Sequence, residues 1–209
     1  VVDVRRGGPS TGLPTKTEQS DLYQALYGRN GECPVPVIAA SMPGNCFKFA
    51  YEASKIAVEH MTPVILLTDG YIANGTEIIA IPNVADLPEI NIPYATPNDP
   101  EYAPYRRDEK TFVRQWAVPG MEGLRHRVGG LEKEHITGSV STNPENHELM
   151  CKNRQAKVEY IANCIGKQEV IGDQEGDLLI VGWGGTYGSL RNSLDEFKAQ
   201  NPDLKVGLA

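Results

Sequence analysis

Three short apolar segments in the first third of the chain constrain its fold more than any other feature. They are Val1–Val4, Val35–Ala40 and Pro63–Thr68. Helices are predicted between them, one from the capping-box spacing of Thr15-Lys-Thr-Glu18 to about Tyr27, the other over Cys46–His60. Because parallel strands need crossovers of a dozen or more residues, this order predicts a parallel α/β sheet.

Composition excludes several classes of protein. The chain has 209 residues, a net charge of −7 and 40% hydrophobic residues, which is ordinary for a folded domain. Lys and Arg cluster only as Arg5-Arg6 and Arg106-Arg107, so neither a nucleic acid nor an anionic membrane is an expected partner. No apolar run approaches the roughly 20 residues that span a bilayer.

The cysteines fit no zinc or iron–sulfur spacing, and none forms a C-x-x-C pair. We therefore expect reduced thiols, a cytoplasmic protein, and any redox cluster on another chain. The four are Cys33, Cys46, Cys151 and Cys164.

The middle of the chain is rich in proline, with seven between Pro82 and Pro119, which predicts a long irregular stretch. A helix then begins at Asn143, the N-cap, with Pro144 in its first turn, and runs toward Gly166. Its predicted face consists of Leu149, Ala156, Tyr160 and Cys164.

The last segment, Asp177–Phe197, predicts a strand, a glycine-rich turn and a helix, and Lys205–Ala209 predicts a further strand. Both ends of the chain fall inside predicted strands, so we expect an internal fragment. Gly182, Gly184 and Gly188 give G-x-G-x-x-x-G, one residue longer than the dinucleotide fingerprint. They could serve a nucleotide-binding or electron-transfer accessory module, or simply a strand–helix turn.

Arg6 lies just past the first strand, where ligands bind in parallel α/β sheets. An arginine fork there suits a carboxylate or phosphate, whereas the alternative is a tight turn with a solvated arginine. Thr11 adds a hydroxyl, and Lys16 could add positive potential. Asp69 ends the third strand and could face the ligand crevice or cap the following loop.

The histidines leave metal binding open as a third interpretation, that of a metal-dependent hydrolase. His147 and Cys151 are one helical turn apart, although H-E-x-x-H is absent. His126 and His135 are the other ligand-type histidines considered. We expect the chain to hold no metal site.

The segment Arg6-Gly-Gly-Pro-Ser-Thr-Gly-Leu-Pro-Thr-Lys16, followed by Glu18-Gln19 and Asp21-Leu22, resembles the alpha subunits of 2-oxoacid:ferredoxin oxidoreductases, most closely the 2-oxoglutarate branch. Further matches follow in order along nearly the whole chain. They are Gly31-Glu32, Val37–Phe47, Pro63–Gly70, Gly130–Glu132, Asn143–His147 and Val181–Thr186.

The resemblance implies oxidative decarboxylation of a 2-oxoacid, with thiamine diphosphate as cofactor, coenzyme A as acyl acceptor and ferredoxin as electron acceptor. A beta subunit would hold the diphosphate, its Mg²⁺ and an iron–sulfur cluster in a hetero-oligomer. Arg6 matches the arginine that grips the substrate carboxylate, and Thr11 faces the same pocket. The fold implied is the second half of a thiamine-type pyrimidine domain (1–82), a connecting segment (83–172) and the start of a transketolase C-terminal-like domain (173–209).

Two departures from the family pattern qualify the match. The Tyr-Pro-Ile-Thr-Pro motif and the glutamate that activates the pyrimidine ring would lie before Val1, so we assign no catalytic residue and expect the isolated fragment to be inactive. The family's Gly-x-Glu-His-Asp-Glu loop runs here as Gly130–His135, leaving Glu132 and Glu134 as the acidic candidates.

Overall fold

A parallel sheet of three strands organises the first part of the molecule. The structure, a computed structural model, describes residues 1–18 and 20–209, so Gln19 of the family-like segment lies outside the described residues. The strands are β1 (Val2–Arg5), β2 (Val37–Ala39) and β3 (Ile65–Asp69), in the order β1-β3-β2. Val2 pairs with Leu66 and Val37 with Ile65, so the predicted parallel sheet is confirmed.

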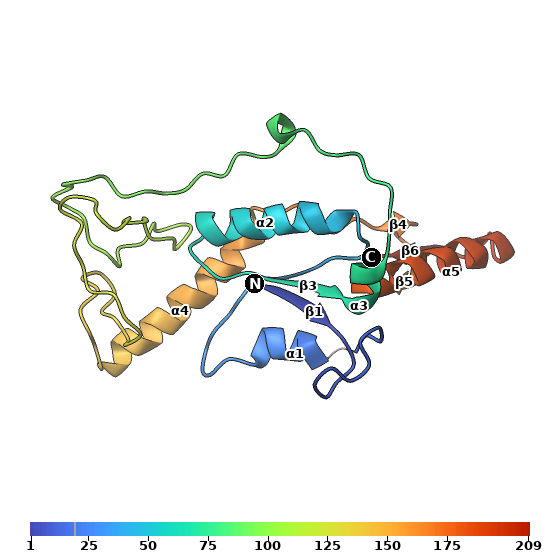
Figure 1. The fold of residues 1–209 in the computed structure, drawn as a ribbon, viewed down its shortest axis with the longest axis horizontal. Coiled ribbons are helices and arrows are strands. Elements are labelled where there is room, and N and C mark those ends of the chain that lie inside the picture. Colours follow the sequence, from blue (N-terminus) through green and yellow to red (C-terminus); the bar gives the residue numbers. More distant parts are fainter. Residues whose placement is uncertain (19) are drawn as a thin grey trace.

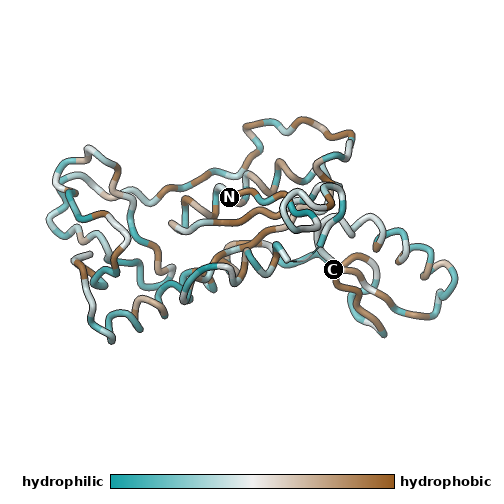
Figure 2. The backbone as a smooth tube through the Cα atoms, turned by 60° about the horizontal axis from the view of Figure 1, so that its bottom comes forward, coloured by the Kyte–Doolittle hydropathy of each residue, from teal (hydrophilic) through white to brown (hydrophobic). Residues whose placement is uncertain are grey.

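Helices α1 (Ser20–Tyr27) and α2 (Asn45–Glu59) lie on opposite sides of this sheet (Figure 1). From α2, the buried Ile56 packs with Val64 and with Ile161 of a later helix. Hydrophobic stretches run along the strands in Figure 2; the central strand β3 is buried, whereas Val2 and Val4 of β1 are exposed.

The predicted start of α1 at Thr15 is wrong, because residues 7–16 close a loop instead. The Gly7 N–H donates to the Lys16 carbonyl (2.5 Å), and the Leu13 N–H donates to the Gly7 carbonyl (2.9 Å). Glu18 accepts a hydrogen bond from the Ser20 hydroxyl rather than capping a helix begun at Thr15. Tertiary closure of the loop overrides the local capping pattern, and α1 begins at Ser20.

The proline-rich middle is irregular, as predicted, with η1 (Val84–Asp86) a single 3₁₀ turn within it. It follows β3 and the short helix α3 (Gly70–Asn74) and runs along the outer side of α2 (Figure 1). Side chains of α2 hold it there: the Tyr51 hydroxyl donates to the Pro88 carbonyl (2.6 Å). In the reverse direction, the Trp116 indole N–H donates to the Val58 carbonyl (2.8 Å).

Helix α4 (Pro144–Ile161) begins where the sequence predicts, with the Asn143 side chain accepting from the Asn146 N–H (2.7 Å). It ends at Ile161, short of Gly166, and its predicted apolar face is wrong, since Leu149 and Cys164 are exposed. The buried positions are Met150, Asn153 and Ile161. This helix is largely polar, so the spacing of its few apolar residues did not indicate the buried side.

A second, smaller sheet forms the end of the chain. Its strands β4 (Ile171–Gly172), β5 (Leu178–Ile180) and β6 (Val206–Leu208) lie in the order β4-β6-β5. As predicted, β5 leads through a glycine-rich 3₁₀ turn, η2 (Gly184–Thr186), into α5 (Tyr187–Gln200) and on to the parallel strand β6. The antiparallel β4 was not predicted. None of the helices within the described residues is both long and apolar enough to span a membrane.

Candidate functional site

The two arginines at the end of β1 point in opposite directions. Arg5 is the last residue of the strand and only 3% exposed, whereas Arg6 is exposed. Successive side chains of a strand alternate between its faces, so one arginine of the pair must turn inward if the other turns outward. Arg5 and Arg6 therefore lie in different environments, one buried and one exposed to solvent.

Arg5 is held at the carboxyl edge of the sheet by three contacts. Its Nη2 lies 3.3 Å from Oδ2 of Asp69, its Nε donates to the Thr68 carbonyl (3.2 Å), and its guanidinium stacks 4.0 Å from the ring centre of Trp183. Burial lowers the pKa of Arg5, and Asp69 opposes that shift. A buried guanidinium with these partners is a structural anchor.

Asp69 is completely buried and uses both carboxylate oxygens within the protein. Oδ1 accepts from the Ile72 N–H (2.8 Å), which caps α3, and Oδ2 accepts from Arg5 and from the Gly185 N–H (3.1 Å). The capping role predicted for Asp69 is thus confirmed. The carboxylate faces inward, toward the second α/β unit, rather than a ligand crevice.

The glycine-rich turn η2 packs against this buried pair. Gly184 has φ +68, and a Cβ there would overlap Nη2 of Arg5; a Cβ on Gly185 would lie 2.5 Å from Oδ2 of Asp69. Only glycine permits such a close approach. The geometry favours the strand–helix turn over the dinucleotide interpretation, because Gly184 of that motif and its neighbour Gly185 pack the turn against the first sheet.

Arg6, Thr11 and Lys16 share one exposed loop, closed by the bridge between Gly7 and Leu13. The Arg6 Nε lies 3.5 Å from the Ser10 carbonyl, and within the described residues no carboxylate oxygen comes within 4.0 Å of its guanidinium. The structure therefore leaves this arginine available for an external anion.

A hollow of about 570 Å³ lies beside this loop, with Arg6 in its wall; Thr11 and Lys16 do not contribute to that wall. Three acidic side chains, Asp3, Glu18 and Asp21, also line it. Burial and the neighbouring Asp21 raise the pKa of Asp3. An anion bound inside the hollow would meet these carboxylates as well as Arg6.

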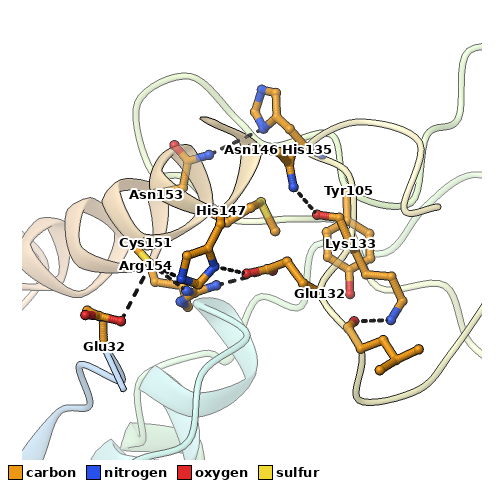
Figure 3. A network of polar contacts seen from close by, with 12 residues as sticks. Glu32, Tyr105, Glu132, Lys133, His135, Asn146, His147, Cys151, Asn153 and Arg154 are labelled. Atoms are coloured by element: carbon orange, nitrogen blue, oxygen red, sulfur yellow. Dashed lines mark hydrogen bonds and ion pairs between the residues drawn. The ribbon is translucent and has the colours of Figure 1, made fainter. Parts of the chain in front are cut away.

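The first turns of α4 carry a second cluster, shown in Figure 3. The His147 Nε2 lies 3.7 Å from the Cys151 Sγ, and Glu32, from the loop between α1 and β2, places Oε2 4.0 Å from the same sulfur. Glu132 Oε2 lies 2.6 Å from the His147 Nδ1. Sequence reasoning singled out His147 and Cys151 but not Glu32, which is 119 residues from Cys151.

The remaining histidines and acidic candidates lie elsewhere. His126 contacts the Tyr102 hydroxyl (3.4 Å), and His135 contacts Arg107 and Asn153. Glu134 closes its own turn by accepting from the Thr137 N–H (2.7 Å), and such bonds lower its pKa. Of the two acidic candidates in this loop, Glu132 is therefore the one beside the His147 cluster.

A cationic cavity of about 470 Å³, unmarked by any sequence motif, lies between α4 and the middle region. Glu132 is the acidic side chain found in its wall among the described residues. Burial, followed by the repulsion of neighbouring cations, lowers the pKa of Lys157 to about 8 and, together with Arg114, that of Arg107 to about 10. The lining cations are Arg107, Arg114, Lys133, Arg154 and Lys157.

Comparison with known proteins places this geometry in context. A protein from Mycobacterium tuberculosis, 2-oxoglutarate oxidoreductase subunit KorA, is 54% identical over 91% of this chain. The 2-oxoglutarate synthase subunit KorA of Methanothermobacter marburgensis is 32% identical over 76% of the chain. The chain spans 29% and 41% of the lengths of these two relatives.

A solved structure is also similar over nearly the whole chain. It is the 2-oxoglutarate:ferredoxin oxidoreductase of Magnetococcus marinus with 2-oxoglutarate, coenzyme A and succinyl-CoA bound, with a TM-score of 0.90 and 36% identity. It covers 99% of this chain, which spans 36% of that one. The predicted fold class and the predicted resemblance are both confirmed.

A family match extends through both the Arg6 loop and the proline-rich middle. Residues 1–144 match the family described as pyruvate flavodoxin/ferredoxin oxidoreductase, thiamine diphosphate-binding. This is more than half of the chain, and the chain therefore belongs to that family.

Proposed function

We propose that this chain is part of the alpha subunit of a 2-oxoglutarate:ferredoxin oxidoreductase. The enzyme would decarboxylate 2-oxoglutarate oxidatively, transfer the acyl group to coenzyme A and pass two electrons to ferredoxin. The observation that carries the proposal is the 54% identity to the M. tuberculosis 2-oxoglutarate oxidoreductase subunit over 91% of the chain. The similarity to the M. marinus structure, extending over both sheets, supports it.

Arg6 is the proposed substrate-binding residue, through a bidentate grip on the carboxylate of the 2-oxoacid. Its position after β1 supports this role, since ligands of parallel α/β sheets bind beyond the carboxyl ends of the strands. The guanidinium is exposed, and no carboxylate from the described residues occupies it. Thr11 and Lys16, on the same loop, would add a hydroxyl and positive potential.

The assignment of the cofactors rests on the family resemblance, and the charges of this region agree with it. The described residues beside Arg6 do not fit a diphosphate, because Asp3, Glu18 and Asp21 line the hollow there. On the family resemblance, we assign the diphosphate of thiamine diphosphate, its Mg²⁺ and an iron–sulfur cluster to a beta subunit. What remains for this chain is to bind and orient the substrate carboxylate.

Domain division, assembly and location complete the proposal. We propose the boundaries 1–82, 83–172 and 173–209, which place the first sheet in one unit and β5 and β6 in the last, with β4 (Ile171–Gly172) at the end of the connecting segment. The enzyme would be a cytoplasmic hetero-oligomer, and the four unpaired cysteines are consistent with a reducing compartment.

The role of Arg6 is tested in the full-length complex. Arg6→Ala should lower kcat/KM for 2-oxoglutarate by about 10- to 100-fold, mainly through KM, because a hydrogen bond to a charged group contributes about 1.5–3 kcal/mol. Arg6→Lys keeps the charge but loses the two parallel hydrogen bonds of the guanidinium, so its kcat/KM should lie between those of wild type and Arg6→Ala. Arg29→Ala, another exposed arginine of the same α/β unit, is the matched control. Unchanged kcat and KM for 2-oxoglutarate in Arg6→Ala would show that Arg6 does not bind the substrate carboxylate.

The division of labour between subunits has its own test. Residues 1–209 alone, supplied with thiamine diphosphate, Mg²⁺, coenzyme A and an artificial electron acceptor, should release no CO₂ from 2-oxoglutarate. Measurable decarboxylation would show that this chain holds a complete cofactor site and would contradict the proposed sharing of the cofactor.

A further inference from the structure

Three side chains able to ligate a metal meet at the start of α4 (Figure 3). His147 and Cys151 come from the first turns of the helix, and Glu32 comes from the loop between α1 and β2. One ligand atom from each lies within 4.8 Å of the other two. The site is thus assembled by tertiary structure from two separate segments.

We propose that Glu32, His147 and Cys151 form a zinc site with water as the fourth ligand. Zinc takes sulfur, imidazole nitrogen and carboxylate oxygen in one tetrahedral shell. With metal–ligand bonds of about 2.0–2.3 Å, two ligand atoms of a tetrahedral site lie about 3.3–3.8 Å apart. The separation of Nε2 and Sγ is 3.7 Å, and that of Sγ and Oε2 is 4.0 Å. The imidazole and carboxylate ligand atoms lie within 4.8 Å of each other, so the exposed Glu32 side chain would move closer to His147 when the ion binds.

The surroundings of His147 prepare its other nitrogen for a metal. A carboxylate only accepts hydrogen bonds, so Glu132, 2.6 Å from Nδ1, requires the proton on that nitrogen. Nε2, the atom nearer Cys151, then presents its lone pair. A carboxylate behind a ligating histidine is a common arrangement in zinc sites, where it fixes the tautomer and raises the basicity of the ring.

Arg154 connects the ligands to this support. Its Nη2 donates to the Cys151 sulfur (3.0 Å), and its Nη1 lies 3.7 Å from Oε1 of Glu132. The charges of the site balance. The Glu32 carboxylate and the Cys151 thiolate neutralise Zn²⁺, and Glu132 neutralises Arg154.

Binding releases the thiol proton of Cys151 to solvent and forms a Zn–S bond, with no change in oxidation state. Because Glu32 and Cys151 are 119 residues apart, the ion would tie the loop before β2 to α4. A metal that binds only the folded state stabilises it by RT ln(1 + [Zn²⁺]/Kd). The proposed consequence is a chelator-sensitive link between the first α/β unit and α4.

The experiment uses the full-length subunit in its native complex. The complex is depleted of zinc with a chelator, titrated with zinc chloride alone and analysed for bound zinc by mass spectrometry. One zinc per alpha subunit is expected in addition to any bound elsewhere. Zinc K-edge X-ray absorption, to which iron does not contribute, should show one sulfur at about 2.3 Å and nitrogen or oxygen ligands at about 2.0–2.2 Å.

Variants assign this zinc to the cluster. Cys151→Ser and His147→Ala should lose one equivalent, whereas Cys164→Ser, which changes an exposed cysteine just beyond α4, should retain it. Glu132→Gln should weaken zinc affinity by about 10- to 100-fold without removing a ligand. Glu32→Gln changes only an exposed loop side chain, so it tests the site even if the helix variants fail to fold.

Two results of the zinc measurements would overturn the proposal. One is a zinc content that is the same in wild type, Cys151→Ser and Glu32→Gln. The other is an absorption spectrum without a sulfur ligand. Alkylation of Cys151 gives an independent readout: zinc should slow its reaction with iodoacetamide and leave Cys164 unaffected. Equal protection of both cysteines would likewise contradict the site.

Discussion

Two regions of this molecule bury cations in different ways. At the carboxyl edge of the first sheet, Arg5 is paired with the fully buried carboxylate of Asp69. Around α4, Lys133 and Lys157 are held by backbone carbonyls: the Lys133 ammonium donates to Gly129 (2.9 Å) and the Lys157 ammonium to Met61 (2.7 Å). The first arrangement uses a full opposite charge, and the second uses only dipoles.

The two regions differ in how neighbouring charges affect the pKa of the buried cation. Asp69 opposes the effect of burial on Arg5, whereas the cations nearest Lys157 add to the effect of burial and lower its pKa to about 8. Carbonyl dipoles satisfy the hydrogen bonds of an ammonium group, but they do not cancel its charge. We infer that the sheet edge depends on its charged pair, whereas the α4 region is under electrostatic strain.

Removal of the carboxylate should produce the largest effect. Asp69→Ala leaves Arg5 buried without a counter-charge, uncaps α3 and frees the Gly185 N–H. Breaking a buried ion pair from one side costs about 3–5 kcal/mol, so we expect a loss of that size in the unfolding free energy of the full-length subunit. Asp195→Ala, which breaks an exposed pair with Arg191, should cause no measurable loss. Similar urea midpoints for the two variants would contradict the anchor role.

Crowding of the same edge should have the next largest effect. In Gly185→Ala the new methyl group would lie 2.5 Å from the Asp69 carboxylate, and overpacking of this kind costs about 1–3 kcal/mol. Gly188→Ala changes a glycine three residues further on, one whose Cβ would meet no described atom within 4 Å. Thermal unfolding should separate the two variants. A destabilised Gly188→Ala beside an unaffected Gly185→Ala would reverse our interpretation of the turn.

The strain around α4 should give the smallest effect, of the order of 1 kcal/mol, since Lys157 retains some contact with solvent. Its pKa is about 8 in the folded state and 10.5 as its ordinary value, so between these pH values the unfolded state binds more protons. Stability attributable to Lys157 therefore rises from pH 8 to pH 10.5. Lys157→Met should remove that part of the pH slope in urea unfolding. Equal slopes of unfolding free energy against pH in the variant and the wild type would exclude this contribution of Lys157.

Sequence patterns predicted the elements whose signals are local. The apolar segments gave a parallel sheet, Asn143 capped α4, and the glycine-rich turn led into α5. The start of α1 was misplaced because the bond between Gly7 and Lys16 depends on loop closure rather than on the local capping pattern. For the same reason Arg6 could be singled out by its place after a strand, while the burial of Arg5 became evident only from its distant partners.

The clusters around α4 were less predictable. His147 and Cys151 share a helix, so their proximity follows from spacing, but Glu32 joins them from another part of the chain. The cationic cavity draws on residues scattered between Arg107 and Lys157, none in a recognisable motif. Irregular segments have no regular spacing of hydrophobic residues, so the sequence does not show which of their polar side chains come together.

The anchoring of Arg5 has a consequence for its neighbour along the chain. Consecutive Cα atoms are about 3.8 Å apart, so the backbone origin of Arg6 is fixed by the immobilised residue before it. The Arg6 guanidinium extends on a long side chain from this fixed backbone position. Trp183 and Gly185, from the segment between β5 and α5, help to hold that position through Arg5 and Asp69. Two features therefore set where the Arg6 guanidinium can go. The length of its side chain sets the distance, and the packing around Arg5 sets the position and direction of the backbone from which it extends.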